Sequence, residues 1–302
     1  MQTYIFLFFR HILSCLCQIA IGDFSMNTFT FAVIGGDRRS FYAAKRLKEH
    51  GFETKLLGLK NEKPFCPLEK TEAEAVLLPI PFTRDGIHLF APESTEKILI
   101  SDVLASVPEN SMIFAGNVSN ITDNRISDYA KREAFALMNA VPTAEGALLL
   151  ALQNGKRTVF GMRVAVIGYG KVAFATAKLF YAVGADVTVF ARKAQARIEA
   201  HMMGYTAKPI SELSDYIDEY ELLINTVPAR ILNREALSKM SKNALLLELA
   251  SAPFGLDFEE AANLGIHAEC ASGLPGRFFP ETAGYAVADT VLDILREKKI
   301  LF

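Results

Sequence analysis

Short apolar segments alternate with amphipathic stretches along most of the chain. In the first half, strands are predicted over 29–36, 52–59, 74–80, 111–117 and 133–139. A helix is predicted over 38–51, with Phe41, Ala44 and Leu47 on one face and Gly51 at its end. Strands that alternate with helices favour a parallel sheet covered by helices. We therefore expect residues 26–141 to form a flavodoxin-like α/β domain.

The pattern changes at residues 141–155, VPTAEGALLLALQNG. Thr143 can cap a helix running from Ala144 to Asn154, which would bridge to a second unit over 142–280. The strands predicted for this unit span 163–168, 186–192, 221–227, 244–250 and 266–271. The last segment, 281–302, contains a helix that we expect to pack back on the first domain. The predicted fold class is thus α/β, with two doubly wound parallel-sheet domains.

A glycine-rich turn opens the second unit. In VAVIGYGKVA, residues 164–173, Gly168 allows a tight turn and Gly170 lets the backbone approach a pyrophosphate. Ala173 lets the following helix pack closely on the strand, and the helix N-terminus presents free N–H groups to phosphates. Because a second strand follows, this βαβ context favours a Rossmann dinucleotide site over an ordinary tight turn. The residues expected to face the sheet from this helix are Val172, Ala175, Leu179 and Val183.

The second strand of this unit ends in Ala191, followed by Arg192 and Lys193. NAD-specific folds place an acid here, about 20 residues after the glycine turn, where it binds the ribose hydroxyls. Without the acid nothing repels a 2′-phosphate, and a guanidinium can grip that phosphate and stack on adenine. The stretch therefore predicts NADP as cofactor, with NAD possible; the alternative is that Arg192 is a solvated loop residue.

Composition excludes several other classes of function. The 302 residues suffice for two domains, and a net charge of −2 gives no long-range attraction to nucleic acid or anionic lipid. Cys15 and Cys17 form only a C-x-C, while Cys66 and Cys270 stand alone, so no zinc spacing is present. We expect no metal site, no nucleic-acid partner and no membrane partner.

The first 25 residues differ from the rest. They are mostly apolar, with Arg10 and His11 in the middle, which fits neither a signal peptide nor an uninterrupted membrane span. We expect a misassigned start with Met26 as the natural initiator; the alternative is a membrane-associated extension.

Several longer stretches occur in an order that resembles one known family. They are FAVIGGDRRSFYAAKRLKEHGFE, PTAEGALLLAL, VAVIGYGKVA, LLINTVPA, LLELASAPFGLDFEEAANLGI and SGLPGRFFPETAGYAVADTVLDIL. Together, over about residues 28–298, they resemble the A subunit of dipicolinate synthase from spore-forming bacteria. The stretches containing LELAS and GLPGR are the most specific. In one departure, Phe254 precedes Gly255 where the family usually has two glycines, which bears on the loop beside the nicotinamide.

The resemblance implies an oxidoreductase that converts a dihydrodipicolinate-level intermediate of the lysine pathway to dipicolinate (pyridine-2,6-dicarboxylate). A nicotinamide cofactor takes the hydride. The resemblance also implies a separate partner, the B subunit of dipicolinate synthase, and hence a homo- or hetero-oligomer. Because the product accumulates in spores, the expected location is the mother-cell cytoplasm during sporulation.

In a doubly wound sheet, ligands lie at the carboxyl ends of the strands. The predicted cofactor-binding residues are Gly168, Tyr169, Gly170, Lys171, Val172, Arg192, Lys193, Asn225, Thr226, Val227 and Pro228. Asn225 and Thr226 offer polar groups near the nicotinamide ribose. For Asn225 and Ser251, local hydrogen bonding within the loops is an equally good interpretation.

A substrate with two carboxylates favours arginine, which binds carboxylates in a bidentate manner. Arg277 is the first candidate and Arg38 the second, with Thr143 and Ser251 as further substrate-binding residues. Loss of a proton needs a base, for which Glu145, His267 and Glu281 are candidates. His267 starts a predicted strand, away from its ligand end, which favours a structural role and leaves Glu145 and Glu281. Two other functions remain open: a two-domain dehydrogenase of the 2-hydroxyacid type, and a non-catalytic nucleotide-sensing protein.

Overall fold

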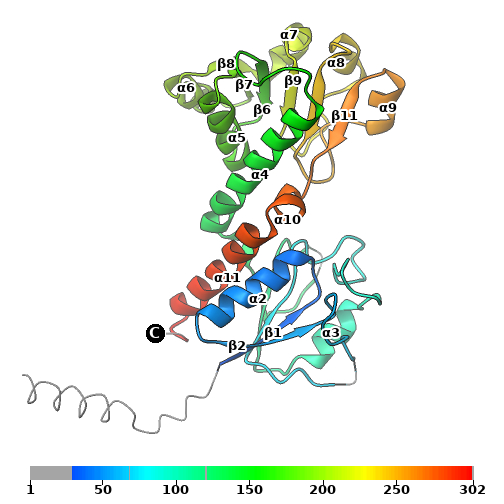
Figure 1. Ribbon diagram of the computed structural model, residues 1–302, viewed down its shortest axis with the longest axis vertical. Coiled ribbons are helices and arrows are strands. Elements are labelled where there is room, and N and C mark those ends of the chain that lie inside the picture. The colour runs from blue at the N-terminus through cyan, green and yellow to red at the C-terminus, as the bar shows by residue number, and fades with distance from the viewer. Residues whose placement is uncertain (1–28, 68, 120, 301–302) are drawn as a thin grey trace, which may run out of the picture.

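A computed structural model of the protein describes residues 29–67, 69–119 and 121–300. It has two α/β domains; α4 (Glu133–Asn154) leads from the first into the second, and α11 (Pro280–Glu297) lies against the first (Figure 1). The predicted fold class, two doubly wound parallel sheets, is confirmed. The interpretations of residues 1–25 and Met26 concern a part of the chain outside the described residues.

The first domain contains a five-stranded sheet in the order β2-β1-β3-β4-β5, with every neighbouring pair parallel. This is the flavodoxin-like order that the alternating pattern predicts. Phe31 and Val33 face α2 and α11, whereas Ala32 and Ile34 face α3 on the other side, as the two-residue period of a strand requires. The elements are β1 (Thr30–Ile34), α2 (Arg38–Glu49), β2 (Glu53–Leu57), β3 (Ala75–Leu77), α3 (Ile100–Ser106), β4 (Met112–Ala115), β5 (Ile126–Asp128) and η1 (Tyr129–Lys131).

The second domain contains a six-stranded parallel sheet in the order β11-β10-β9-β6-β7-β8, which is the order of dinucleotide-binding folds. Helices α4 and α5 cover one face, and α7, α8 and α9 cover the other. The strands are β6 (Arg163–Ile167), β7 (Asp186–Ala191), β8 (Thr206–Pro209), β9 (Leu222–Asn225), β10 (Leu245–Glu248) and β11 (His267–Cys270). The helices are α5 (Lys171–Ala182), α6 (Ala194–Met202), η2 (Ile210–Glu212), α7 (Leu213–Tyr216), η3 (Ile217–Glu219), α8 (Arg234–Lys239), α9 (Phe258–Asn263) and α10 (Leu274–Phe278).

The strand predicted over 133–139 is wrong, because these residues form the first turns of α4. Pro142 lies inside that helix, where it removes one backbone donor, yet α4 continues because it packs against α5, α10 and α11. Thr143 is correspondingly not an N-cap: its hydroxyl donates to the Asn139 carbonyl at 2.7 Å within the helix. The boundary proposed at 141/142 therefore falls within a continuous helix.

The face of α5 that packs on the sheet is also shifted from the prediction. Its buried residues are Ala173, Thr176, Ala177 and Phe180. Three of them lie one position after the predicted Val172, Ala175 and Leu179, whereas the predicted Val183 is exposed. Ala173 is fully buried, as the glycine-turn fingerprint requires. The sequence pattern also missed β5 and β8, which are short edge strands with polar residues.

Helix α4 is long and apolar enough to cross a membrane by length and composition. Half of its most apolar stretch is buried inside the protein. That burial fits its position between the two domains, where it forms part of the core of the second (Figure 1).

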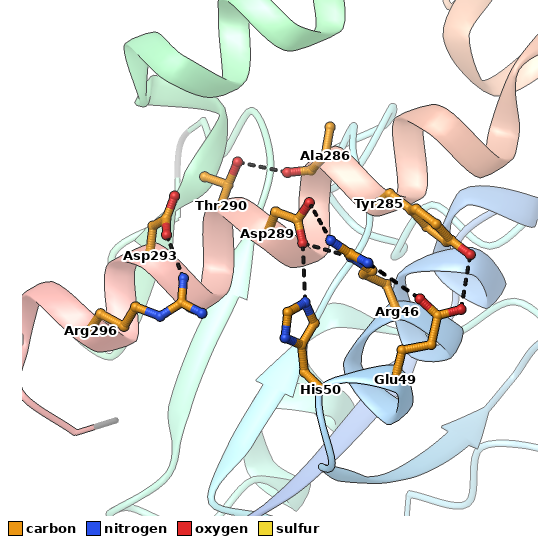
Figure 2. Close-up of polar contacts among 9 residues, drawn as sticks. All are labelled: Arg46, Glu49, His50, Tyr285, Ala286, Asp289, Thr290, Asp293 and Arg296. Atoms are coloured by element: carbon orange, nitrogen blue, oxygen red, sulfur yellow. Dashed lines mark hydrogen bonds and ion pairs between the residues drawn. The ribbon is translucent and has the colours of Figure 1, made fainter. Parts of the chain in front are cut away.

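Helix α11 packs along α2 and completes the core of the first domain. Ala286 and Val291 join the cluster that contains Phe31 and Leu47. A polar seam borders this contact: Arg46 Nε donates to Asp289 Oδ1 at 2.9 Å, and the Tyr285 hydroxyl donates to Glu49 at 3.1 Å (Figure 2). The last helix of the chain thus binds an early helix through both apolar and charged contacts.

At Gly284, α11 leaves no room for a side chain against α2. A Cβ added there would lie 2.5 Å from the carbonyl oxygen of Arg39 and 2.7 Å from Tyr42 Cβ. Alanine ordinarily stabilises a helix interior by about 1 kcal/mol relative to glycine, but overpacking costs about 1–3 kcal/mol. Because the obstacle is backbone, we expect Gly284→Ala to lower the melting temperature in thermal unfolding.

The control for this prediction is Asp293→Ala on the exposed side of α11. It removes an ion pair with Arg296 at 2.8 Å, and exposed pairs contribute less than about 1 kcal/mol. A melting temperature of Gly284→Ala that equals or exceeds that of the wild type would contradict the packing described here.

Candidate functional site

The glycine turn after β6 has the conformation that a phosphate site needs. Gly168 has a φ of +100°, and a Cβ there would lie 2.5 Å from Thr226 Oγ1. Gly170 is the N-cap of α5, and no side chain caps this helix. A Cβ added at Gly170 would meet nothing within 4 Å. Open space therefore faces uncapped N–H groups at the positive end of a helix, which fits a pyrophosphate.

The side chains around this turn are engaged elsewhere. The Tyr169 ring packs against the core and lies 6.0 Å from the Phe174 ring. Burial raises the pKa of Tyr169 to about 12, and its hydroxyl has no hydrogen-bond partner among the described residues. Lys171 Nζ pairs with Glu133 at 3.2 Å, and Val172 packs partly against the core. The contacts of Tyr169, Lys171 and Val172 with the cofactor stay predictions, and these side-chain contacts favour their backbone as the part that would make them.

The end of β7 carries cations and no acid. Ala191 is buried, whereas Arg192 and Lys193 are exposed before α6. Arg197 Nη1 donates to the carbonyl oxygens of Ala191 at 3.0 Å and Arg192 at 2.9 Å. Arg197 adds a third cation to this strand end that the sequence analysis missed. Its signal in the sequence is an arginine in the first turns of the helix that follows the strand.

Hydrogen bonds of its own side chains fix the turn after β9. Asn225 is 0% exposed; its Nδ2 donates to the Val227 carbonyl at 3.0 Å and its Oδ1 accepts from the Val227 N–H at 3.2 Å. The Thr226 hydroxyl donates to the Ile167 carbonyl at 2.8 Å. These bonds favour the alternative interpretation, in which the Asn225 side chain supports the turn; its contact with the nicotinamide ribose stays a prediction. Val227 is partly buried and Pro228 is exposed beyond it.

The sequence analysis also missed Glu248, the last residue of β10. It is 0% exposed and accepts hydrogen bonds from Asn225 Nδ2 at 2.9 Å and from the Ala250 N–H at 3.0 Å. Burial raises the pKa of Glu248, while the hydrogen bonds it accepts oppose that rise. A single acid within the apolar run from 245 to 250 was the available signal.

The predicted substrate-binding residues lie in different surroundings. Arg277 is in α10, where its Nη1 donates to Glu269 of β11 at 3.3 Å and its guanidinium lies 4.6 Å from the centre of the Phe278 ring. Arg38 is exposed on the first turn of α2, and Ser251 is exposed in the loop after β10. The pairing with Glu269 occupies one nitrogen of the Arg277 guanidinium, so the role of Arg277 in substrate binding remains a prediction.

The two candidate bases are not in equivalent positions. Glu145 is exposed on α4 and lines an apolar groove against α5 together with Phe174 and Lys178. Glu281 is in the first turn of α11, where it pairs with Lys45 of α2 at 3.3 Å. Thr143 is buried within α4. Of the predicted residues, the structure groups those after β6, β7, β9 and β10 at one sheet edge.

Both domains match known family models. Residues 30–139 match the N-terminal domain of the dipicolinate synthase A subunit. Residues 144–254 match the NAD-binding domain of D-isomer-specific 2-hydroxyacid dehydrogenases. The second match covers the glycine turn and the ends of β7, β9 and β10. An NAD-binding domain needs room for a pyrophosphate, which the open space in front of α5 provides. The match therefore supports an NAD-dependent oxidoreductase.

Relatives extend these matches over most of the chain. The chain is 34% identical to the dipicolinate synthase A subunit of Bacillus subtilis, over 88% of this chain and 95% of that protein. The crystal structure of the dipicolinate synthase A subunit from Bacillus halodurans is similar with a TM-score of 0.79 and 29% identity, over 88% of this chain and 97% of that one. A transhydrogenase from Sinorhizobium meliloti shares the fold at 13% identity, with a TM-score of 0.63, over 89% of this chain and 94% of that one. The chain thus belongs to the family of dipicolinate synthase A subunits.

Proposed function

We propose that this protein oxidises a dihydrodipicolinate-level intermediate to dipicolinate with hydride transfer to NAD(P), in a lysine-pathway branch used for sporulation. The observation that carries the proposal is the uncapped, open N-terminus of α5 in a chain that belongs to the family of dipicolinate synthase A subunits. Neither a 2-hydroxyacid dehydrogenase nor a nucleotide sensor needs a site for two carboxylates. Those alternatives therefore predict no turnover of the dicarboxylate.

In this proposal, different residues bind the cofactor, orient its nicotinamide end and bind the substrate. The backbone at 168–170 and the N-terminus of α5 bind the pyrophosphate, and the turn 225–228 orients the nicotinamide end. When bound, the nicotinamide accepts a hydride. Arg277 and Arg38 are proposed to bind the substrate carboxylates.

The substrate also loses a proton. Glu281, beside Lys45 at the start of α11, and Glu145 on α4 are the proposed acceptors. Aromatisation of the ring supplies driving force, so a strong base is not required.

The proposal includes a partner and a location. The family name of the relatives denotes one component of a larger enzyme, which supports a complex with the dipicolinate synthase B subunit. The proposed location is the cytoplasm of the mother cell. Dicarboxylate made there would supply the spores, in which the product accumulates.

The test is purification of the full chain with and without the B subunit, followed by turnover of the lysine-pathway intermediate. Two signals are measured together: the absorbance of dipicolinate and the fluorescence of the reduced nicotinamide. We expect dipicolinate and reduced nicotinamide to form in equimolar amounts. Dinucleotide binding without formation of either product, in the presence of the B subunit, would favour the nucleotide sensor.

Arg277→Leu tests the dicarboxylate site. A charged hydrogen bond contributes about 1.5–3 kcal/mol, so we expect the KM for substrate to rise about tenfold or more. Dinucleotide binding should stay near that of the wild type, because the Arg277 guanidinium contacts Glu269 and Phe278 and not the glycine turn. Arg296→Leu, which removes an exposed arginine of α11, is the control. An unchanged KM in Arg277→Leu would assign the Arg277 guanidinium to its pairing with Glu269 alone.

A further inference from the structure

A fully buried acid ends one of the central strands of the second sheet. Glu248 lies opposite Asn225 in the pairing of β10 with β9, and both side chains are 0% exposed. The three residues before Glu248 are leucines. A buried carboxylate is unfavourable unless hydrogen bonds satisfy it, so the contacts of Glu248 determine why an acid can occupy this position.

Two segments of chain bind the Glu248 carboxylate. The N–H groups of Ala250 and Gly255 donate to Oε1 and Oε2, each at 3.0 Å, and so hold both ends of the loop 250–255. Asn225 Nδ2 donates to both oxygens at 2.9 Å and also to the Val227 carbonyl at 3.0 Å. Glu248 therefore ties the loop 250–255 to the turn 225–228.

The hydrogen-bond pattern specifies a carboxylate. Every group that bonds to the Glu248 oxygens is an N–H donor, and an ionised carboxyl group is acceptor-only. Glutamine has the same shape but must direct its NH₂ group at the N–H of either Ala250 or Gly255. An isosteric amide therefore replaces one hydrogen bond by two opposed donors in a buried site.

Gly255 is part of the same arrangement. A Cβ added there would lie 2.1 Å from Asn225 Nδ2 and 3.1 Å from Glu248 Oε2. The neighbouring Phe254 instead turns toward α9, with its ring 5.4 Å from that of Phe258. The chain thus tolerates a large side chain at 254, whereas the contact with Glu248 and Asn225 requires glycine at 255.

We propose that Glu248 is a positioning residue for the nicotinamide half of the dinucleotide, because it fixes the turn 225–228 and the loop 250–255 in one arrangement. The doubly wound sheet consists of two mononucleotide-binding halves. In this chain β6, β7 and β8 serve the adenine half, and β9, β10 and β11 serve the nicotinamide half. The inference rests on the dinucleotide site of the proposed function.

The experiment compares ligands that occupy both halves of the dinucleotide site with fragments that occupy only the adenine half. Dissociation constants are measured for NADPH and NADH, and for their adenine-half fragments 2′,5′-ADP and 5′-ADP, with wild type, Glu248→Gln and Gly255→Ala. Glu248 acts through the turn and the loop and not on the ligand itself, and loss of such a supporting residue typically weakens binding by about tenfold or more. We expect that weakening for the dinucleotides only. Hydrogen exchange of the Ala250 and Gly255 amides should also accelerate in Glu248→Gln without any ligand.

Leu246→Ala is the matched control, because Leu246 lies two positions earlier on the same face of β10 and is 0% exposed. It should lower the stability of the protein without changing its affinity for the dinucleotides or for the fragments. Equal weakening of dinucleotides and fragments in both Glu248→Gln and Gly255→Ala, or no weakening in either, would overturn the role of Glu248. A wild type that binds neither dinucleotide would instead refute the proposed function, and this inference with it.

Discussion

Gly170→Val should abolish tight dinucleotide binding while the protein remains folded. The Val side chain would enter the open space in front of α5, where the pyrophosphate must approach the N–H groups of the first turn. Loss of two charged hydrogen bonds, at about 1.5–3 kcal/mol each, corresponds to at least about a hundredfold weaker binding. The φ of −86° at Gly170 suits any residue, so valine causes no backbone strain there. Valine is a poor N-cap, which should lower the free energy of unfolding by only about 1 kcal/mol.

Titration of nicotinamide fluorescence measures this effect, and thermal unfolding measures the stability. Ala182→Val at the exposed far end of α5 is the matched control, since it places the same side chain on the same helix away from the phosphate turn. Its dissociation constant should equal that of the wild type. Wild-type affinity in Gly170→Val would show that the dinucleotide lies elsewhere.

We propose that the wild type prefers NADP, and the double change Ala191→Asp with Arg192→Ala should shift the cofactor preference to NAD. The aspartate would bind the ribose hydroxyls and repel a 2′-phosphate, while removal of Arg192 takes away a cation that can grip it. Each change is expected to shift the ratio of kcat/KM values by about tenfold or more, so together by about a hundredfold. Ala191 is 2% exposed, so thermal unfolding of each variant checks that the buried carboxylate leaves the protein folded.

The measurement is kcat/KM with each cofactor for the wild type, both single variants and the double variant. Arg157→Ala is the control, since Arg157 pairs with Glu221 before β6 begins, away from the carboxyl strand ends. A wild-type ratio near one, or a ratio that the double variant leaves unchanged, would refute the assignment of Arg192 to the 2′-phosphate. In that case Arg197, bonded to the carbonyl oxygens of residues 191 and 192, would be the next cation to replace.

Local patterns in the sequence were sufficient to predict the two sheets and the glycine turn. Each central strand is a short apolar run, and Gly168, Gly170 and Ala173 lie at the spacing that a phosphate-binding turn requires. Residues 133–139 were misassigned because a short apolar run before a proline fits a strand as well as a helix. Packing of α4 against three other helices decides between the two, and that information is not local.

The side-chain partners at the site could not be predicted in the same way. Asn225 and Glu248 are far apart in the chain and meet only because β9 and β10 are neighbours in the sheet. Likewise, nothing in the sequence near Arg277 indicates that Glu269 binds it. Strand-end motifs therefore locate the cofactor edge, whereas the assignment of Asn225 to ligand or to loop depends on the pairing of strands.

The position of α11 has a consequence for the order in which the protein folds. Phe31 and Leu47 are synthesised early, but the surface that buries them includes Ala286 and Val291, near the end of the chain. A ribosome must therefore translate the whole dinucleotide-binding domain before the first domain can close its core. During that interval the face of the first sheet and α2 exposes apolar surface, which is the kind of surface that chaperones bind and that promotes aggregation.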